Sequence, residues 1–207
     1  MSDSAIWTRN GVTDTRLVRN FSYVNGKWTA GDDNATITVT NPADGAMLGD
    51  VASLSATQAK AAVDAAQAAF PDWSMTLPQD RSALLRRWFD LMLEHKEDLA
   101  RIMVLEQGKP LSEALGEIDY AAGFIEYYAE EAKRPNVEGV TSHLPDAEVE
   151  LWLEPVGVAA LITPWNFPAA MLTRKAAAAM AAGCTIVAHP SGETPYSALA
   201  LAELAER

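Results

Sequence analysis

The order of apolar and polar residues changes several times along the chain, and each change predicts a different kind of element. Residues 19–52 hold short alternating stretches between turn residues, with Asn25-Gly26 at a hairpin position, so they predict short strands. The pattern Ser55-Ala-Thr-Gln58 is a capping box, and the Ala-rich segment behind it predicts a helix that ends before Pro71.

The middle of the chain has apolar residues at helical spacing. One helical segment opens at Pro78 and continues through residues 96–107 until Gly108 stops it. A long helix over about residues 112–133 follows, and Pro135 closes it.

Period-two alternation returns in residues 147–154, where apolar side chains alternate with mostly acidic ones. This pattern predicts a strand with one charged face. Such a strand needs a partner, which we expect elsewhere in a larger chain or in another subunit.

From residue 156 the pattern becomes that of an α/β protein. The stretch "VGVAALIT" predicts a buried strand, residues 168–182 predict a helix with Gly183 just past its end, and "CTIVAHP" predicts a second buried strand. Thr194-Pro195 is expected to cap a final helix that runs to Arg207. One βαβα unit of a parallel sheet is not stable alone, so a truncated chain is predicted.

Composition excludes several classes of function. The 207 residues carry a net charge of −12, which disfavours binding to nucleic acid or to anionic lipid. The N-terminus has no secretory pattern, and prolines and basic residues interrupt the apolar region 156–188, so no membrane span is expected. A single cysteine, Cys184, and three scattered histidines predict neither a disulfide nor a metal site. A reducing cytoplasm is the expected compartment.

Six blocks of sequence resemble the aldehyde dehydrogenase superfamily, and most closely its succinate-semialdehyde dehydrogenase branch. They are "VTNPADGAMLGDVA", "PDWSMTLPQDRSALLRRW", "LEQGKPLSEALGEI", "LEPVGVAALI", "TPWNFP" and "TRKAAAAMAAGCTIVAHPSGETPYSALALAELAE". The resemblance implies the N-terminal part of that α/β fold. Residues 1–137 would be the strands and helices of the coenzyme-binding domain, residues 138–155 the β-ribbon of an oligomerisation arm, and residues 156–207 the first half of a Rossmann-like core, with the catalytic domain absent.

In that family Asn166 would be the amide of the oxyanion hole. Thiol attack on an aldehyde leaves negative charge on the former carbonyl oxygen, and a fixed NH₂ donor held away from water lowers the barrier by about 3–4 kcal/mol. Pro164 and Pro168 restrict the backbone around the amide at the carboxyl edge of the sheet. The alternative, favoured by spacing alone, is that Asn166 only caps the following helix.

The resemblance assigns further roles to the helix after this turn. Phe167 and Met171 would line the substrate tunnel, although helix-face packing explains both residue types equally well. Arg174, about two helical turns past Asn166, matches the arginine that binds the distal carboxylate of the substrate. Lys175 resembles a family lysine near the cofactor, and a solvated basic pair is the alternative for both.

The implied cofactor is NAD or NADP, with the preference undecided. The residues expected to face it are Ile162, Thr163, Pro164, Trp165, His189 and Gly192. At two of these positions the chain departs from the family pattern. His189 replaces a lysine that bonds the adenosine ribose, and Gly192 supplies no side-chain bond. Weakened cofactor affinity is therefore expected.

The nucleophilic Cys, the general-base Glu and the Gly-rich cofactor turn of the family would all lie beyond residue 207. Cys184 stands at the start of a buried strand, where a thiol holds little thiolate. We expect the complete form to oxidise succinate semialdehyde, or a similar carboxylate-bearing aldehyde, as a homo-oligomer, and this chain alone to be inactive. The alternative is a non-catalytic truncated paralogue that pairs with full-length subunits. Glutamyl-phosphate reductase, a third reading, fits "TPWNFP" less well.

Overall fold

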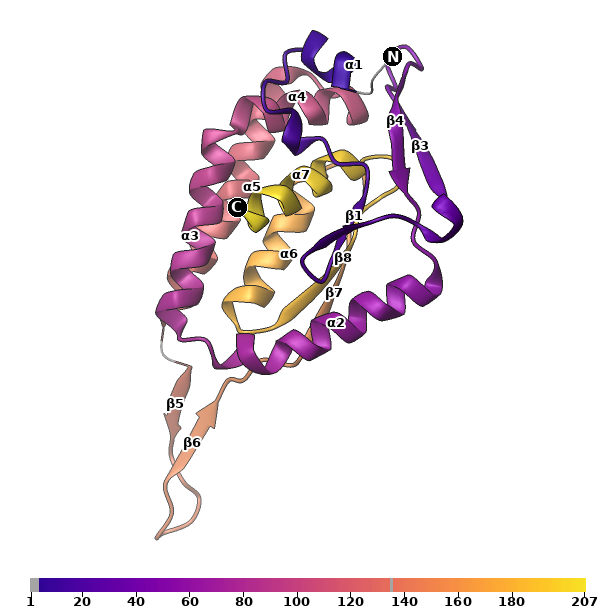
Figure 1. Ribbon diagram of the computed structural model, residues 1–207. Helices are drawn as coiled ribbons and strands as arrows, with labels where there is room; N and C mark the ends of the chain where they lie inside the picture. Colours follow the sequence, from indigo (N-terminus) through magenta and orange to yellow (C-terminus); the bar gives the residue numbers. More distant parts are fainter. Residues whose placement is uncertain (1–3, 135) are drawn as a thin grey trace.

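The computed structural model describes residues 4–134 and 136–207, and in this part of the chain helices predominate over four small two-stranded sheets (Figure 1). The N-terminal half contains α1 (Ser4–Arg9), β1 (Ser22–Val24), β2 (Lys27–Thr29), β3 (Thr36–Thr40), β4 (Met47–Ala52), α2 (Ala56–Met75), α3 (Pro78–Glu94) and α4 (Lys96–Gln107). The C-terminal half contains α5 (Leu111–Glu131), β5 (Val137–Val140), β6 (Val149–Trp152), β7 (Val158–Ile162), α6 (Ala170–Ala181), β8 (Thr185–His189) and α7 (Pro195–Glu206).

The local signals of the first 60 residues form as predicted. Asn25 and Gly26 have φ angles of 50° and 72°, the left-handed values that a two-residue turn between β1 and β2 requires. Both bonds of the capping box are present: Gln58 N donates to Ser55 Oγ at 3.2 Å, and Ser55 N donates to Gln58 Oε1 at 3.0 Å.

Two predicted helix boundaries are wrong. Helix α2 does not end before Pro71 but continues to Met75. Pro71 and Gln67, whose carbonyl loses its helical donor there, are both exposed, so solvent can take the place of the missing bond. The second difference is at His95, which separates α3 from α4 in what the periodicity predicts as one continuous segment.

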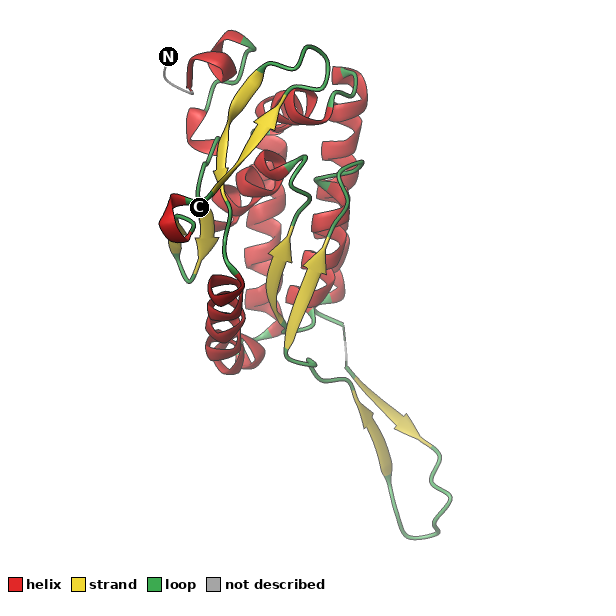
Figure 2. Cartoon of the chain, turned by 90° about the vertical axis from the view of Figure 1, so that its right-hand side faces the viewer, coloured by secondary structure: helices red, strands yellow, loops and turns green. Residues whose placement is uncertain are grey.

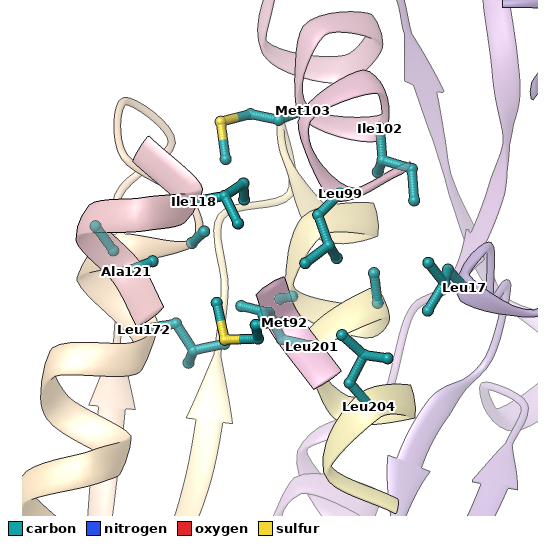
Figure 3. Packing of buried hydrophobic residues seen from close by; sticks show 14 of the residues in the cluster. Leu17, Met92, Leu99, Ile102, Met103, Ile118, Ala121, Leu172, Leu201 and Leu204 are labelled. Carbon is teal, nitrogen blue, oxygen red and sulfur yellow. The ribbon is translucent and has the colours of Figure 1, made fainter. Parts of the chain in front are cut away.

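The main core lies among the helices. Helix α5 packs against α3, α4 and α6, and α7 packs against α3 and α4. Figure 3 shows how their side chains meet, with Met92, Leu99, Ile118 and Leu201 each at most 2% exposed. The parallel strands pack against this helical body.

Strands β7 and β8 pair in parallel, with Val158 opposite Thr185 and Ile162 opposite His189. Helices α2 and α6 both contact this pair of strands (Figure 2). The prediction of two fully buried strands is wrong for this chain, because Ile162 and His189 are exposed. Each strand has a single neighbour among the described residues, and a parallel sheet buries its strands only when more units cover it.

Strand β6 finds its partner within the chain, which corrects the expectation of a distant or intersubunit partner. It pairs antiparallel with β5, with Val137 opposite Trp152. The hairpin projects away from the helical body, and all four residues of β6 are exposed (Figures 1 and 2). Pro135, expected to close the long helix, lies outside the described residues. The division into three segments at residues 137 and 155 stays a prediction.

Candidate functional site

The residues singled out from the sequence converge on one edge of the parallel strands. Ile162 ends β7 and His189 ends β8, and the two are paired in register. One residue further, Thr163 N donates to His189 O at 3.2 Å. The turn over residues 163–169 therefore starts at the carboxyl ends of two parallel strands, where open α/β sheets bind ligands.

Asn166 lies on the exposed part of this turn. Its carboxamide makes no hydrogen bond to any described residue, and Ala169, the N-cap residue of α6, has no side-chain cap. Helix capping by Asn166, the alternative left open above, is therefore wrong. The carboxamide is a free donor, but it faces solvent and is not held away from water within this chain.

The first turn of α6 is capped from another helix. Glu117, in the middle of α5 and 3% exposed, accepts hydrogen bonds from Ala169 N at 3.0 Å and Ala170 N at 3.2 Å. A buried carboxylate at this position satisfies two otherwise free amides and stabilises the positive end of the helix dipole. Its other oxygen forms an ion pair with Lys109 Nζ.

Lys109 connects this cap to the Asn166 turn. Its ammonium donates to Asn166 O at 3.1 Å and lies 4.4 Å from the centroid of the Phe167 ring. The lysine follows Gly108, which ends α4 with a φ of 85° and would place any Cβ 2.8 Å from Pro42 Cγ. Glycine is favoured at this left-handed, crowded position. The chain changes direction there, and the next residue, Lys109, reaches the Asn166 turn.

Helix α7 is capped in a related way, by Glu106 of α4. This carboxyl group accepts from Tyr196 N and from Ser197 N, each at 2.7 Å, and is 3% exposed. Burial raises the pKa of Glu106 to about 8, although the hydrogen bonds from Ser197 and Tyr196 act in the opposite direction. Thr194, predicted as the cap, makes no cap bond, and its buried hydroxyl has no partner among the described residues.

The remaining predicted residues lie on the turn and on helix α6, which follows it. Trp165 and Phe167 are 55% and 42% exposed, and Met171 is half-buried against the core. Arg174 is exposed and makes no ion pair with a described residue, whereas Lys175 Nζ donates to Ile162 O at 3.1 Å.

Of the residues predicted to face a cofactor, Thr163 is buried, and Pro164, His189 and Gly192 are exposed. A Cβ added at Gly192 would meet only Ile37 Cδ1 at 3.9 Å, so space is open beside this glycine. Cys184 is buried, as expected. Within residues 4–134 and 136–207, no helix is long and apolar enough to cross a membrane.

Sequence reasoning missed three residues, Lys109, Glu117 and Glu106. A signal existed for Glu117, since it occupies a core-facing position of α5 between Ala114 and Ala121, where an unpaired carboxylate would be costly. Lys109 and Glu117 are eight positions apart, but the residues that they and Glu106 hold on the Asn166 turn and at the starts of α6 and α7 lie 52 to 91 positions away, and no local pattern predicts such contacts.

Comparison with known proteins identifies the family. Residues 28–207 match the model of the aldehyde dehydrogenase family. The chain belongs to this family. Among curated members, it is 54% identical over 194 residues to glutarate-semialdehyde dehydrogenase of Pseudomonas putida, and 52% identical over 196 residues to the NADP(+) succinate-semialdehyde dehydrogenase GabD of Escherichia coli.

The structural likeness to other aldehyde dehydrogenases is equally close. The crystal structure of succinate-semialdehyde dehydrogenase from Burkholderia pseudomallei superposes with a TM-score of 0.93 at 49% identity, over 95% of this chain and 41% of that one. The two curated relatives are matched over 94% and 95% of this chain and 40% and 41% of their own lengths. The 207 residues thus form a partial, N-terminal copy of the family fold.

Proposed function

We propose that this chain is the N-terminal part of a nicotinamide-dependent aldehyde dehydrogenase that oxidises succinate semialdehyde or a similar carboxylate-bearing aldehyde to the acid. One observation carries the proposal. The Asn166 carboxamide stands free at the carboxyl ends of two parallel strands, while its backbone is bonded through Lys109. The carboxamide N–H groups are not used to cap a helix, and the backbone that carries them is held in place. Such a donor can stabilise a developing oxyanion.

The role of Asn166 follows from the charge that appears during the reaction. When a thiolate attacks the aldehyde carbon, the carbonyl π electrons move to oxygen, and the carboxamide N–H donates to this oxygen. Loss of one such donor costs about 10²- to 10³-fold in kcat. Because Asn166 is exposed here, exclusion of water must come from residues outside this chain, as must the thiolate.

Arg174 is proposed to hold the distal carboxylate of the substrate. Its guanidinium is exposed on α6, on the helix that Asn166 precedes, and it is not engaged with any described carboxylate. A planar guanidinium can donate two parallel hydrogen bonds to a carboxylate. Phe167 and Met171, on the same turn and helix, would contact the carbon chain between the two ends of the substrate.

The residues at the strand ends fit a nicotinamide cofactor. Exposed Ile162, Trp165 and His189 and the open space at Gly192 leave a surface that the described residues do not fill. When bound, such a cofactor accepts the hydride from the substrate carbon. Gly192 neither repels nor bonds a 2′-phosphate, so NAD and NADP both remain compatible with these residues.

The test compares two forms of the protein. Alone, the 207-residue chain is expected to give no nicotinamide reduction with succinate semialdehyde and NAD or NADP, because Cys184 is buried. In a longer form that carries a catalytic cysteine, Asn166→Ala should lower kcat by about 10²-fold, and Arg174→Gln should raise KM. Lys60→Gln, which removes an exposed charge on α2, is the matched control. Turnover by the short chain, or unaffected kcat in Asn166→Ala, would refute the proposal.

A second candidate function, pairing with full-length subunits without catalysis, is favoured by the projecting hairpin. Leu151, Trp152 and Leu153 are 52–68% exposed on it, and such apolar edge strands are prone to pair with another chain. Size-exclusion chromatography of the chain alone and mixed with a full-length relative separates the two ideas. If the chain is a folded monomer that neither associates with the relative nor binds nucleotide, both proposed functions are refuted.

A further inference from the structure

We propose that Lys109 and Glu117 are positioning residues that set the place of the Asn166 carboxamide. The proposal rests on the role of Asn166 proposed above, and it assigns to α5 and to the α4–α5 connection the task of holding a turn that lies about 50 residues later. Neither residue touches the reacting atoms in this arrangement. Their effect passes through the backbone of the turn.

The ion pair holds the turn at four points. Lys109 Nζ donates to Asn166 O at 3.1 Å and lies 4.4 Å from the centroid of the Phe167 ring. Glu117 Oε1 accepts from Ala169 N at 3.0 Å and from Ala170 N at 3.2 Å. The backbone of the turn is thus held at the main-chain carbonyl of Asn166 by the lysine, and three to four residues later at the amides of Ala169 and Ala170 by the glutamate.

The turn has few other means of staying in place. Pro164 and Pro168 have no backbone N–H to donate. Among the described residues, the backbone bonds of the segment are Thr163 N to His189 O at its start and, at its end, Met171 N to Phe167 O and Thr173 N to Ala169 O. Between them the Lys109–Glu117 pair supplies the polar contacts found among the described residues. Both side chains are at least 91% buried, so loss of either partner would leave an uncompensated buried charge.

Capping of a helix does not by itself require a lysine, and α7 provides the comparison. Glu106 caps Tyr196 and Ser197 with no ion-pair partner among the described residues. The lysine is present only at the α6 cap, where its ammonium also reaches the carbonyl of Asn166. This difference points to the turn, and not to the helix alone, as what Lys109 serves.

The test uses amide hydrogen exchange of the 207-residue chain, followed residue by residue by NMR. In Lys109→Met, exchange of Ala169 and Ala170 should become about tenfold faster relative to Tyr196 and Ser197, and the two side-chain amide protons of Asn166 should each move towards the chemical shift they have in an unstructured chain. Lys109→Arg, which keeps the charge, should restore most of the protection. The control is Lys96→Met. It breaks an exposed ion pair between Lys96 and Asp119, and Asp119 lies on α5, the helix that carries Glu117.

Equal acceleration at both helix starts would mean a general loss of stability and would overturn the proposal, as would unchanged exchange at Ala169 and Ala170. If Lys109→Met does not fold, Glu117→Gln gives the same comparison, because its amide oxygen still accepts from the helix while its ion pair is lost. None of these measurements needs substrate, so failure of the oxyanion role leaves them valid.

In the longer form with a catalytic cysteine, Lys109→Met should lower kcat about tenfold with KM changed less than about twofold. The same substitution should have little further effect in an Asn166→Ala background, because no carboxamide is left to position. A tenfold loss in both backgrounds would show that the lysine acts independently of Asn166.

Discussion

The buried carboxyl group of Glu106 should make the stability of this chain fall as the pH rises. Burial raises its pKa from 4.5 to about 8 in the folded chain. Between these values the folded chain binds more protons than the unfolded chain, so the free energy of unfolding decreases with increasing pH. The sign is opposite to that of a carboxylate stabilised by an ion pair, whose contribution is lost on acidification.

The magnitude follows from the same two pKa values. At about 1.36 kcal/mol per pH unit, the loss between pH 4 and pH 9 approaches 5 kcal/mol, a large fraction of the 5–15 kcal/mol that typically stabilises a domain. Glu106→Gln removes the titration but keeps one oxygen, which can accept from one of the two amides, Tyr196 N or Ser197 N. The variant should therefore gain stability over the original chain as the pH rises from 5 to 8.

The assay is urea unfolding followed by far-ultraviolet circular dichroism at pH values from 4 to 9. Glu113→Gln serves as the control, since Glu113 is an exposed carboxylate of α5. Its stability should follow the same pH dependence as the original chain. If Glu106→Gln and the original chain keep a constant difference in stability from pH 5 to 8, the carboxyl group does not titrate there and the reasoning is refuted.

Three further predictions follow from single sites. Ser55→Ala removes half of the capping box of α2 and should cost about 1 kcal/mol in urea unfolding; a loss under a few tenths would contradict the cap. Hydrogen bonds from Arg16 and Arg207 hold the pKa of Asp14 well below its usual range, so its contribution to stability is present above about pH 4 and lost as the pH falls. Asp14→Asn should therefore make the fall in stability at acidic pH less steep. An unchanged acid transition would contradict the stabilisation of the Asp14 carboxylate by these arginines. His189→Lys should strengthen binding of NAD and NADP in calorimetric titration of the longer form, and equal affinities would disprove a weakened contact at this position.

Sequence reasoning succeeded where the cause of a structure is local. The turn at Asn25-Gly26, the capping box at Ser55 and the Gly183 end of α6 all depend on residues within a few positions of one another. The resemblance to aldehyde dehydrogenases supplied what local patterns could not, namely the N-terminal part of that fold. The role of Asn166 stays a prediction, and the structure adds the contact of its backbone carbonyl with Lys109.

The failures have physical reasons as well. Pro71 penalises a helix only through one lost bond and a local clash, and an exposed position of α2 tolerates it. The partner of β6 is a strand of four residues that includes Gly139, too short and too weakly patterned to be recognised. The caps of α6 and α7 come from Glu117 and Glu106, and a hydrogen bond across 52 or 90 residues has no local signature.

These distant caps bear on the order in which the chain can fold during its synthesis. Glu106 and Glu117 are synthesised well before α7 and α6, whose first backbone amides donate hydrogen bonds to them. Helices α4 and α5 can therefore pack together before α6 and α7 form. Helix α6 has no side-chain cap of its own, and a short isolated helix is marginal in water. Each later helix would then start where a carboxylate that is already in place accepts its first amides. Misplacement of α5 would in turn displace the turn that carries Asn166.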